Sequence, residues 1–403
     1  MGFQIIEGEQ FDSLIAVMEA QNHLIAHQNA AIDLLASDKR AELVTNLDAF
    51  AQLVGAGEVL EVMDYGDQIN LPWRERTTEY VAPMNLCHLE EAELEDGETI
   101  KVADVEWHYT IPMGMPFDAS EALFESETEK AAGTYHFTIA NDLWGSNNGK
   151  SVQFTLPQAL PPGYQIRKSG AYNADIFNCT LDVYESAASR TKLYSMTPTS
   201  GTGGTNLGTT DGSGDMNHWH RVVLGYNRWK TSNMRQYLNA TGAVGTWWTK
   251  QNKWDVKPSE ADTYDGFLHG YDESFLQYFK ATKIQTACNT VTDSGVTDTT
   301  YDRVFLSSLE QMYCVPQASG IEGEYWEYYK RLLGRTSPAQ TSQTYTRLIK
   351  YALNAKTSAQ NCWRRSCNRG SATSVWYVYA SGDVYANSAY NAFRCAPCLR
   401  IGV

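Results

Sequence analysis

The sequence predicts an α+β protein built from three consecutive parts. Residues 1–57 show helical periodicity, residues 58–199 contain short β-branched and aromatic segments, and residues 200–403 mix helical segments with strands. A chain of 403 residues is long enough for two or three domains, each with its own core. The apolar content of 43% and the charged content of 20% are those of a globular protein.

The first part is predicted to be a helical segment for oligomerisation or attachment. Residues 8–36 contain no proline and no glycine after Gly8. Apolar residues and two glutamines recur there in alternating steps of three and four, which defines the a and d positions of a coiled coil. These positions are Phe11, Leu14, Met18, Gln21, Ile25, Gln28, Ile32 and Leu35. An amphipathic helix that packs on its own domain would give the same pattern, so this alternative stays open. A second helix is expected from Lys39 to Leu53, ending at Gly55 and Gly57.

The second part is predicted to be a sandwich-like β domain. Its candidate strands are short, rich in β-branched and aromatic residues, and separated by turn sequences such as DGET, SNNGK and PPG. Strands at such spacing are typical of a sandwich or a barrel-like domain. The candidate strands are residues 100–111, 133–141, 150–156, 164–168 and 181–186.

The third part begins after the sharpest change of composition in the chain. Residues 198–215, PTSGTGGTNLGTTDGSGD, are rich in Gly, Thr and Ser and predict a loop at the domain boundary. Beyond it, we expect a helix capped by Thr231 or Ser232 and a helix that runs into a strand at 272–286. Further helical stretches are expected at 324–334 and 344–355, and the chain closes in a β-rich tail.

Charge and hydropathy exclude two classes of partner. The formal net charge of −15 argues against a general nucleic-acid binder, which needs a basic face for phosphates. The opening MGFQIIEGEQ lacks the basic region of a signal peptide, and no apolar run approaches the ~20 residues that span a bilayer. We therefore expect synthesis in a cytosol, no membrane insertion, and cysteines that start reduced.

Four cysteines bracket the tail and allow three interpretations. Cys362, Cys367, Cys395 and Cys398 have the ligand types of a zinc site, although their spacing is loose. The CAPC sequence is typical of a redox pair, but it lies too close to the chain end for the helix that would activate its first cysteine. The third interpretation is small buried thiols or one disulfide.

No other motif predicts catalysis or a metal. His218 and His220 would share a face of a strand and, with Asp211 or Asp215, could bind a metal, although such a pair is more often structural. Acidic neighbours such as Glu90 with Glu91 are expected on the solvated surface. The sequence contains no phosphate loop, dinucleotide fingerprint or GxSxG motif. We therefore predict no enzyme activity, no cofactor and no metal.

The tail SVWYVYASGDVYANSAYNAFRC, residues 374–395, has the composition of a recognition surface. Residues 366–393 hold four Tyr, five Ser and three Asn, and they hold no Lys, Glu, Gln, Met, Leu or Ile. Tyrosine gives broad amphipathic contact at low entropic cost, and Ser and Asn give adaptable hydrogen bonds, as in antibody paratopes. An edge hairpin whose polar face meets only water would have a similar composition, so both interpretations stand.

The residues around this tail carry a resemblance to a known family. WRRS at 363–366, VWYVYASGDV at 375–384 and RCAPCLRI at 394–401 form a framework, with NRWKTSNMRQYLN and FLSSLEQM upstream. Over residues 200–403 the chain resembles the C-type-lectin-like domain of variable proteins diversified by phage and bacterial retroelements. It also looks like a related uncharacterised domain of gut bacteria and their phages. Cys367 and Cys398 depart from the pattern, because Pro and a small or apolar residue are expected there.

The resemblance implies a fixed lectin-like scaffold that displays exchangeable side chains. In that family, miscopying of template adenines scatters certain codons over many residues, but never over Lys, Glu, Gln, Met or Trp. The window has one Trp, Trp376, which is assigned to the scaffold with Trp363, Val378, Val384, Arg394 and Pro397. The implied variable, ligand-binding residues are Asn368, Ser371, Thr373, Ser374, Tyr377, Tyr379, Ser381, Asp383, Tyr385, Asn387, Ser388, Tyr390, Asn391 and Phe393.

The function implied is that of a phage virion protein, most simply a homotrimer, that binds a host surface ligand. Its expected partners are a host cell-surface protein or glycan and other phage structural proteins. A basic rim of Arg364, Arg365 or Arg369 would favour acidic glycans or anionic surface polymers. Framework arginines often make buried structural hydrogen bonds instead, so this alternative stays open.

Three alternatives remain beside the variable receptor-binding protein. The first is a non-variable head-decoration or fibre protein whose lectin-like domain only packs against neighbours. The second is an enzyme of the formylglycine-generating type that uses Cys395 or Cys398. The third is a calcium-dependent sugar-binding protein, for which the sequence offers no clustered carboxylate and amide set.

Overall fold

The computed structural model describes residues 17–18, 21, 46–140, 142, 145–210, 213–214, 216 and 219–403. In these residues the protein is β-rich with short helices, in agreement with the predicted α+β class. Most of the predicted coiled-coil positions lie outside the described residues, so the seam stays a prediction. The described residues contain no helix that is long and apolar enough to cross a membrane.

The helices are short and scattered between the strands. Residues 17–18 and 21 are helical, and the α-helices from residue 46 onward are α2 (Leu47–Ala56), α3 (Trp219–Leu224), α4 (Asn233–Asn239), α5 (Glu273–Leu276) and α6 (Glu327–Leu333). The 3₁₀ turns are η1 (Val59–Glu61), η2 (Ile176–Asn178), η3 (Trp229–Thr231), η4 (Ser259–Asp262), η5 (Phe267–Gly270) and η6 (Thr346–Leu348).

The strands fall into two groups along the chain. Up to the middle of the sequence they are β1 (Gln68–Glu75), β2 (Thr78–Glu93), β3 (Thr99–Trp107), β4 (Met115–Pro116), β5 (Phe124–Glu125), β6 (Gly133–Thr138), β7 (Ser151–Leu156), β8 (Gln165–Ser169), β9 (Thr180–Tyr184), β10 (Lys192–Met196), β11 (Thr199–Ser200), β12 (Thr205–Thr209) and β13 (Ser213–Gly214). The later strands are β14 (Thr282–Ala287), β15 (Thr297–Asp302), β16 (Val304–Phe305), β17 (Lys350–Ala352), β18 (Ala355–Gln360), β19 (Cys362–Cys367), β20 (Ser374–Val378), β21 (Val384–Ser388), β22 (Ala392–Cys395) and β23 (Cys398–Ile401).

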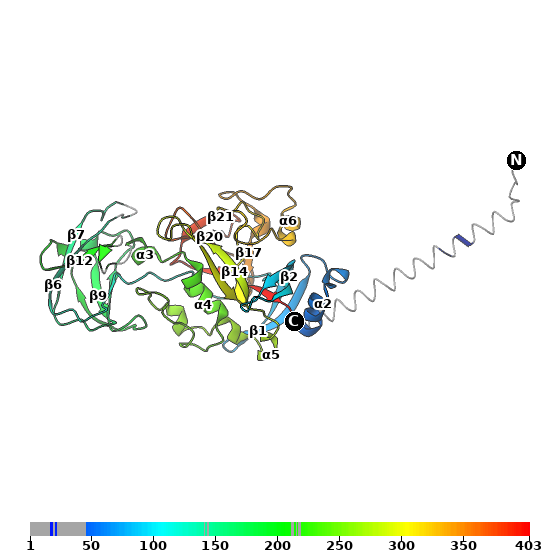
Figure 1. Cartoon of the computed structure of the whole chain (residues 1–403), viewed down its shortest axis with the longest axis horizontal. Helices are drawn as coiled ribbons and strands as arrows, with labels where there is room; N and C mark the ends of the chain where they lie inside the picture. Colours follow the sequence, from blue (N-terminus) through cyan, green and yellow to red (C-terminus); the bar gives the residue numbers. More distant parts are fainter. Residues whose placement is uncertain are drawn as a thin grey trace, which may run out of the picture.

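The main body joins the beginning and the end of the described chain in one sheet. Its strand order is β1-β2-β3-β23-β16, so the last strand of the protein lies between an early strand and a late one. The backbone N–H of Trp107 at the end of β3 donates to the carbonyl of Pro397 at 2.9 Å, which extends the pairing by one residue before β23. Helix α2 lies beside the C-terminus, at the end of the body away from the β6–β12 lobe (Figure 1). This sheet and the elements around it share one hydrophobic core, built from residues 47–117 and 229–401 with Ala187.

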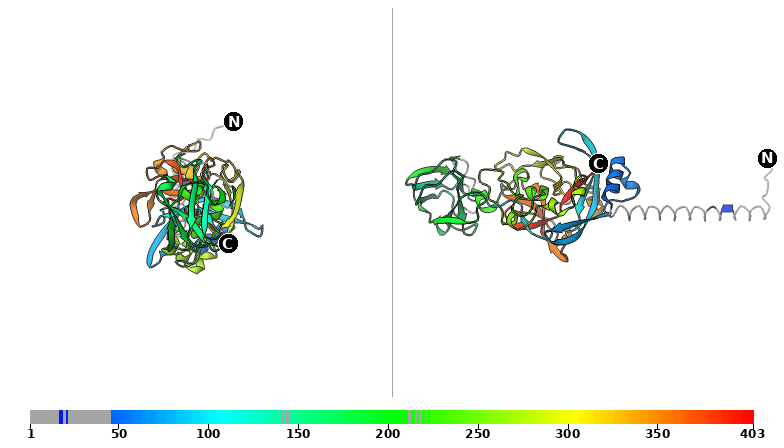
Figure 2. Two further views of the ribbon diagram at one scale, coloured as in Figure 1. Left: turned by 90° about the vertical axis from the view of Figure 1, so that its left-hand side faces the viewer. Right: turned by 90° about the horizontal axis from the view of Figure 1, so that it is seen from below.

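Residues 123–224 form a lobe with a separate hydrophobic core. One of its sheets runs β10-β9-β8-β5, and another runs β11-β7-β6-β12-β13. Apolar side chains from both sheets enter the same core, as expected for a two-sheet β domain. The lobe lies at one end of the elongated molecule in both side views (Figures 1 and 2).

The cores do not follow the predicted boundary between residues 199 and 200. Strands β1 to β3 pack with the C-terminal part, and helix α3 packs with the lobe. The Gly-rich segment 198–215, predicted to be a loop at the domain boundary, supplies β11, β12 and β13. A side chain at Gly204 would place its Cβ 1.9 Å from the carbonyl oxygen of Thr134, so the glycine permits close pairing with β6. The composition of this segment predicts a loop, because composition does not reveal that β6, a strand far away in the sequence, pairs with it.

Two predicted helix ends are confirmed by their caps, and one predicted helix is wrong. The Ser232 hydroxyl accepts from the backbone N–H of Arg235 at 3.1 Å, which makes Ser232 the N-cap of α4. Gly57 ends α2 in the left-handed conformation. Residues 344–355, predicted to be helical, form instead the η6 turn, β17 and the start of β18. Strand β17 pairs with β18, and Ala352 forms a β-bridge with Thr110. This backbone pairing outweighs the helical spacing of the segment's apolar residues.

Candidate functional site

The Tyr-rich tail forms a β-hairpin in a sheet of order β21-β20-β19-β22-β4. Tyr377 on β20 lies opposite Tyr385 on β21, and Trp363 on β19 lies opposite Tyr377. Directly opposed residues point to the same face of a sheet. The three rings therefore form a row across the three strands. The predicted β-rich tail is thus a hairpin with Tyr377 and Tyr385 on one face, and Trp376, the preceding residue of β20, points to the other.

The rings of this row differ in exposure. The side chain of Tyr377 is only 3% exposed, because it packs against both Trp363 and Phe393 with ring centroids 5.8 Å and 5.1 Å away. Tyr379 and Tyr385 are 44% and 55% exposed. The hairpin thus has an exposed aromatic pair above a buried aromatic layer.

The predicted variable residues do not share one environment. Tyr379, Ser381 and Tyr385 are exposed, and Thr373 and Tyr377 are buried. The partly exposed residues are Asn368, Ser371, Ser374, Asp383, Asn387, Ser388, Tyr390, Asn391 and Phe393. Because Tyr377 and Thr373 are buried, they are part of the scaffold, which composition alone does not reveal.

Other predicted variable residues are held by hydrogen bonds. The Asn227 side-chain amide donates to the carbonyls of Ser371 and Ser374 at 2.6 Å and 2.9 Å, which fixes the loop before β20. The Asn391 amide donates to the Asn387 side-chain oxygen at 3.0 Å. Tyr390 packs against the core of the β lobe. These contacts leave the tip of the hairpin as the part whose side chains are most open to a ligand.

A shallow pocket lies at this tip. It has a volume of about 390 Å³ and is lined by Ser342, Tyr377, Tyr379, Asp383 and Tyr385. Four of these residues belong to the predicted variable set. The volume is at the lower end of the ~300–1,000 Å³ that small-molecule sites occupy.

The carboxylate of Asp383, in the turn at the tip, accepts hydrogen bonds from two hydroxyl groups. The Ser381 hydroxyl donates to Asp383 at 2.6 Å, and the Thr344 hydroxyl donates to the other carboxylate oxygen. These two hydrogen bonds lower the pKa of Asp383 below its usual value. Asp383 therefore carries a negative charge at neutral pH.

A segment outside the predicted site completes the pocket. The backbone N–H of Ser342 donates to the carbonyl of Val384 at 2.7 Å, and the N–H of Tyr345 donates to the carbonyl of Gly382 at 2.8 Å. Residues 342–345 thus cover the free edge of β21. Ser342 has a φ of 59°, a left-handed conformation that is uncommon outside glycine. The run of Thr, Ser and Gln before Tyr345 is the sequence signal of this loop.

The arginines expected on a basic rim are buried instead. Arg364 donates to Glu106 at 2.7 Å, and both side chains are at most 1% exposed. Arg365 donates to the carbonyls of Leu306 and Glu322 at 2.7 Å and 2.8 Å. The rim prediction for these two residues is therefore wrong, because their guanidinium groups satisfy interior acceptors. Arg369 is partly exposed and lies in the loop that ends β19.

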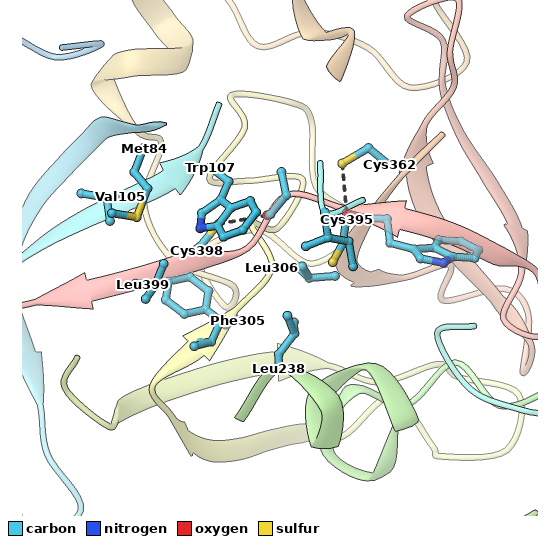
Figure 3. Close-up of a cluster of buried hydrophobic side chains, with 14 of the residues drawn as sticks. Met84, Val105, Trp107, Leu238, Phe305, Leu306, Cys362, Cys395, Cys398 and Leu399 are labelled. Atoms are coloured by element: carbon cyan, nitrogen blue, oxygen red, sulfur yellow. Dashed lines mark hydrogen bonds between the residues drawn. The ribbon is translucent and has the colours of Figure 1, made fainter. Parts of the chain in front are cut away.

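All eight cysteines of the sequence lie in the described residues, and all are free and buried. Figure 3 shows Cys362, Cys395 and Cys398 among the side chains of the main core. Burial raises the pKa of the Cys395 and Cys398 thiols well above the ordinary value, which keeps both protonated and poorly nucleophilic.

Among the residues that the structure describes, no group of three His, Cys, Asp or Glu side chains is placed to hold a metal ion. His218, Asp211 and Asp215 lie outside the described residues, so the proposed histidine pair is not placed.

The comparisons with known proteins identify a domain but no activity. Residues 203–402 match the model of a domain of unknown function, DUF6273. The match contains the hairpin and the pocket, but it omits β1 to β3, which complete the sheet around β23. No curated protein and no solved structure matches the chain.

Proposed function

We propose that the protein is a phage virion protein that binds host surface ligands through the tip of the β20–β21 hairpin. In this proposal the C-terminal half has a C-type-lectin-like scaffold, and its exposed tail residues are diversified. The protein is not an enzyme. The supporting observation is the exposed pair Tyr379 and Tyr385 beside the buried rings of Trp363 and Tyr377, on which the partly exposed ring of Phe393 also packs.

The physical argument is that a stiff base reduces the entropic cost of binding. The tip is closed by a hydrogen bond from the Tyr379 N–H to the Asp383 carbonyl at 2.8 Å, and its outer edge is covered by residues 342–345. Side chains on such a frame lose little backbone freedom when a ligand binds. They are also replaceable without loss of core packing, which diversification requires.

The N-terminal segment supplies the proposed attachment and oligomerisation. A homotrimer would present three weak sites together, and the avidity would exceed the affinity of one site. Sedimentation equilibrium of the full chain tests this part. A monomeric mass at micromolar concentration would rule it out.

Adhesion of the full chain to bacterial cells tests the proposed function. The fluorescently labelled protein is added to a panel of gut bacterial isolates, and the double variant Tyr379→Ala/Tyr385→Ala is expected to lose at least ~10-fold in adhesion to the isolates that bind the parent. The matched control is Tyr172→Ala/Tyr351→Ala, because these tyrosines are 44% and 39% exposed elsewhere on the surface. Equal loss in both double variants, or none in either, would reject the hairpin tip as the binding face.

A non-variable structural protein is the second candidate. The observation that favours it is the extensive packing of the tail on its own chain, above all at Thr373, Tyr377 and Tyr390. Sequencing the 3′ end of the gene in sibling phages separates the two candidates. Changes confined to codons with adjacent adenines support diversification, and evenly spread silent changes support the structural protein.

A further inference from the structure

The rings around the tip pocket have the arrangement of an aromatic cage. The rings of Tyr377 and Tyr379 lie 6.0 Å apart between centroids and are inclined by 71°, so they form two walls of a corner. Tyr385 is the cross-strand neighbour of Tyr377 and lines the same pocket. The faces of tyrosine rings are electron-rich, so exposed rings that line one pocket attract cations.

A negative charge accompanies these rings. Asp383 lines the same pocket as Tyr377, Tyr379 and Tyr385. No ion pair to Asp383 occurs among the described residues, and its two recorded side-chain partners are the neutral hydroxyls of Ser381 and Thr344. The carboxylate thus contributes an uncompensated charge to the pocket.

We propose that this pocket binds an alkylated ammonium group, of the kind carried by choline-bearing surface polymers or by methylated lysine side chains. The inference rests on the proposed function, because it names the chemistry of the ligand at the same site. Cation–π attraction from the exposed rings of Tyr379 and Tyr385 and the charge of Asp383 act on the same volume, and Tyr377 lines its buried base.

The pocket is expected to prefer an alkylated ammonium group to a primary one, because the two differ in hydration and in their need for hydrogen-bond acceptors. A primary ammonium is strongly hydrated and needs hydrogen-bond acceptors when it leaves water. The Asp383 oxygens already accept from Ser381 and Thr344, so the pocket offers charge and ring faces more readily than new acceptors. A quaternary ammonium group loses little hydration and needs no acceptor. An anionic ligand would be repelled by Asp383.

Calorimetric titration of the full chain tests the proposal. The probes are choline and its neutral isostere 3,3-dimethyl-1-butanol, followed by phosphocholine and Nε-trimethyl-lysine to distinguish the two sources of the group. We expect choline to bind at least ~10-fold more tightly than the isostere, since only the charged probe gains from the rings and the carboxylate.

Three variants assign the binding to the pocket. Asp383→Asn keeps the shape of the side chain and should weaken choline binding at least ~10-fold, as should Tyr385→Leu, whereas Tyr385→Phe keeps the ring and should bind choline like the parent. The matched control is Asp96→Asn, an exposed aspartate of another turn whose carboxylate accepts a hydrogen bond from the backbone N–H of Glu98. An unchanged thermal midpoint shows that each variant is folded.

Equal binding of choline and the isostere, or full binding by Asp383→Asn, would overturn the inference. Cell adhesion measured in parallel separates this failure from that of the proposed function. Adhesion that choline does not compete for leaves the receptor-binding function intact and rejects the cation pocket. Choline binding without adhesion to any isolate keeps the cation pocket and rejects the receptor-binding function.

Discussion

Tyr377 and Tyr385 face each other across two strands, yet they have different environments. Tyr377 is 3% exposed and contacts Trp363 and Phe393, whereas Tyr385 is 55% exposed. A buried ring contributes packing and transfer free energy that an exposed ring lacks. The same residue type therefore has a structural role on β20 and is available for recognition on β21.

Alanine substitutions should separate these two roles. We expect Tyr377→Ala to lower the free energy of unfolding by about 3 kcal/mol, because it leaves a cavity beside two rings. Tyr385→Ala should change it by less than about 0.5 kcal/mol, as is usual for surface substitutions. Urea unfolding of both variants measures the difference. Similar losses in the two variants would mean that Tyr385 is also part of the frame.

At the scale of elements, the hairpin depends on one close approach. Gly382 has a φ of 96°, and a Cβ there would lie 2.7 Å from the carbonyl oxygen of Tyr345. The residue therefore allows both the turn and the contact with the segment that covers β21. Gly97, at the turn between β2 and β3, has a similar φ of 87° with nothing within 4 Å of its Cβ position.

This pair of glycines allows a controlled measurement. Gly97→Ala should cost about 1 kcal/mol of unfolding free energy, which is the cost of the left-handed conformation alone. Gly382→Ala should cost about 1–3 kcal/mol more, because the backbone of residues 345–346 must shift. Chemical denaturation of both variants gives the two values. Equal costs would show that the covering segment yields without penalty and is not a stiff wall of the pocket.

The elements also show how far the sequence predicts the structure. Local signals succeed at two places: Ser232 caps α4, and the predicted β-rich tail forms the β20–β21 hairpin. Non-local pairing is missed, since nothing local indicates that β23 lies beside β3 or that residues 342–345 pair with β21. Exposure within the tail is missed for the same reason. Tyr377 is buried by Trp363 and Phe393, which lie on other strands.

At the scale of the whole molecule, a buried charge network joins distant parts of the chain. Glu106 on β3 accepts from Arg364 at 2.7 Å and from Lys350 at 2.8 Å, and all three side chains are buried. Burial alone would raise the pKa of Glu106, but the two cations outweigh it and lower this pKa to about 2. The network therefore ties β3 to β17 and β19.

Acid should reduce the contribution of this buried charge network to the free energy of unfolding. Since the folded-state pKa of Glu106 lies below the ordinary value of 4.5, its stabilisation is complete above pH 4.5 and is lost as the pH falls toward about 2. The shift corresponds to about 3 kcal/mol. Glu106→Gln should cost about 3–5 kcal/mol at pH 7, because it leaves two buried cations without their carboxylate. The difference in unfolding free energy between Glu106→Gln and the parent protein should become smaller toward pH 2.

Unfolding free energies measured from pH 7 to pH 2 check this prediction. Glu91→Gln is the control, because Glu91 is an exposed carboxylate on the neighbouring strand β2. A Glu106→Gln variant as stable as the parent at neutral pH would contradict the network's role in joining the parts.

The central claim is that the exposed side chains at the hairpin tip are exchangeable for recognition while the layer beneath them is fixed. A substitution scan of residues 363–395 in the full chain, scored separately for protease resistance and for adhesion to one bound isolate, tests it most directly. The account predicts that changes at Tyr379, Ser381 and Tyr385 alter adhesion without altering protease resistance, whereas changes at Trp363 and Tyr377 abolish both. Adhesion that survives every folded substitution at the three exposed positions would contradict it.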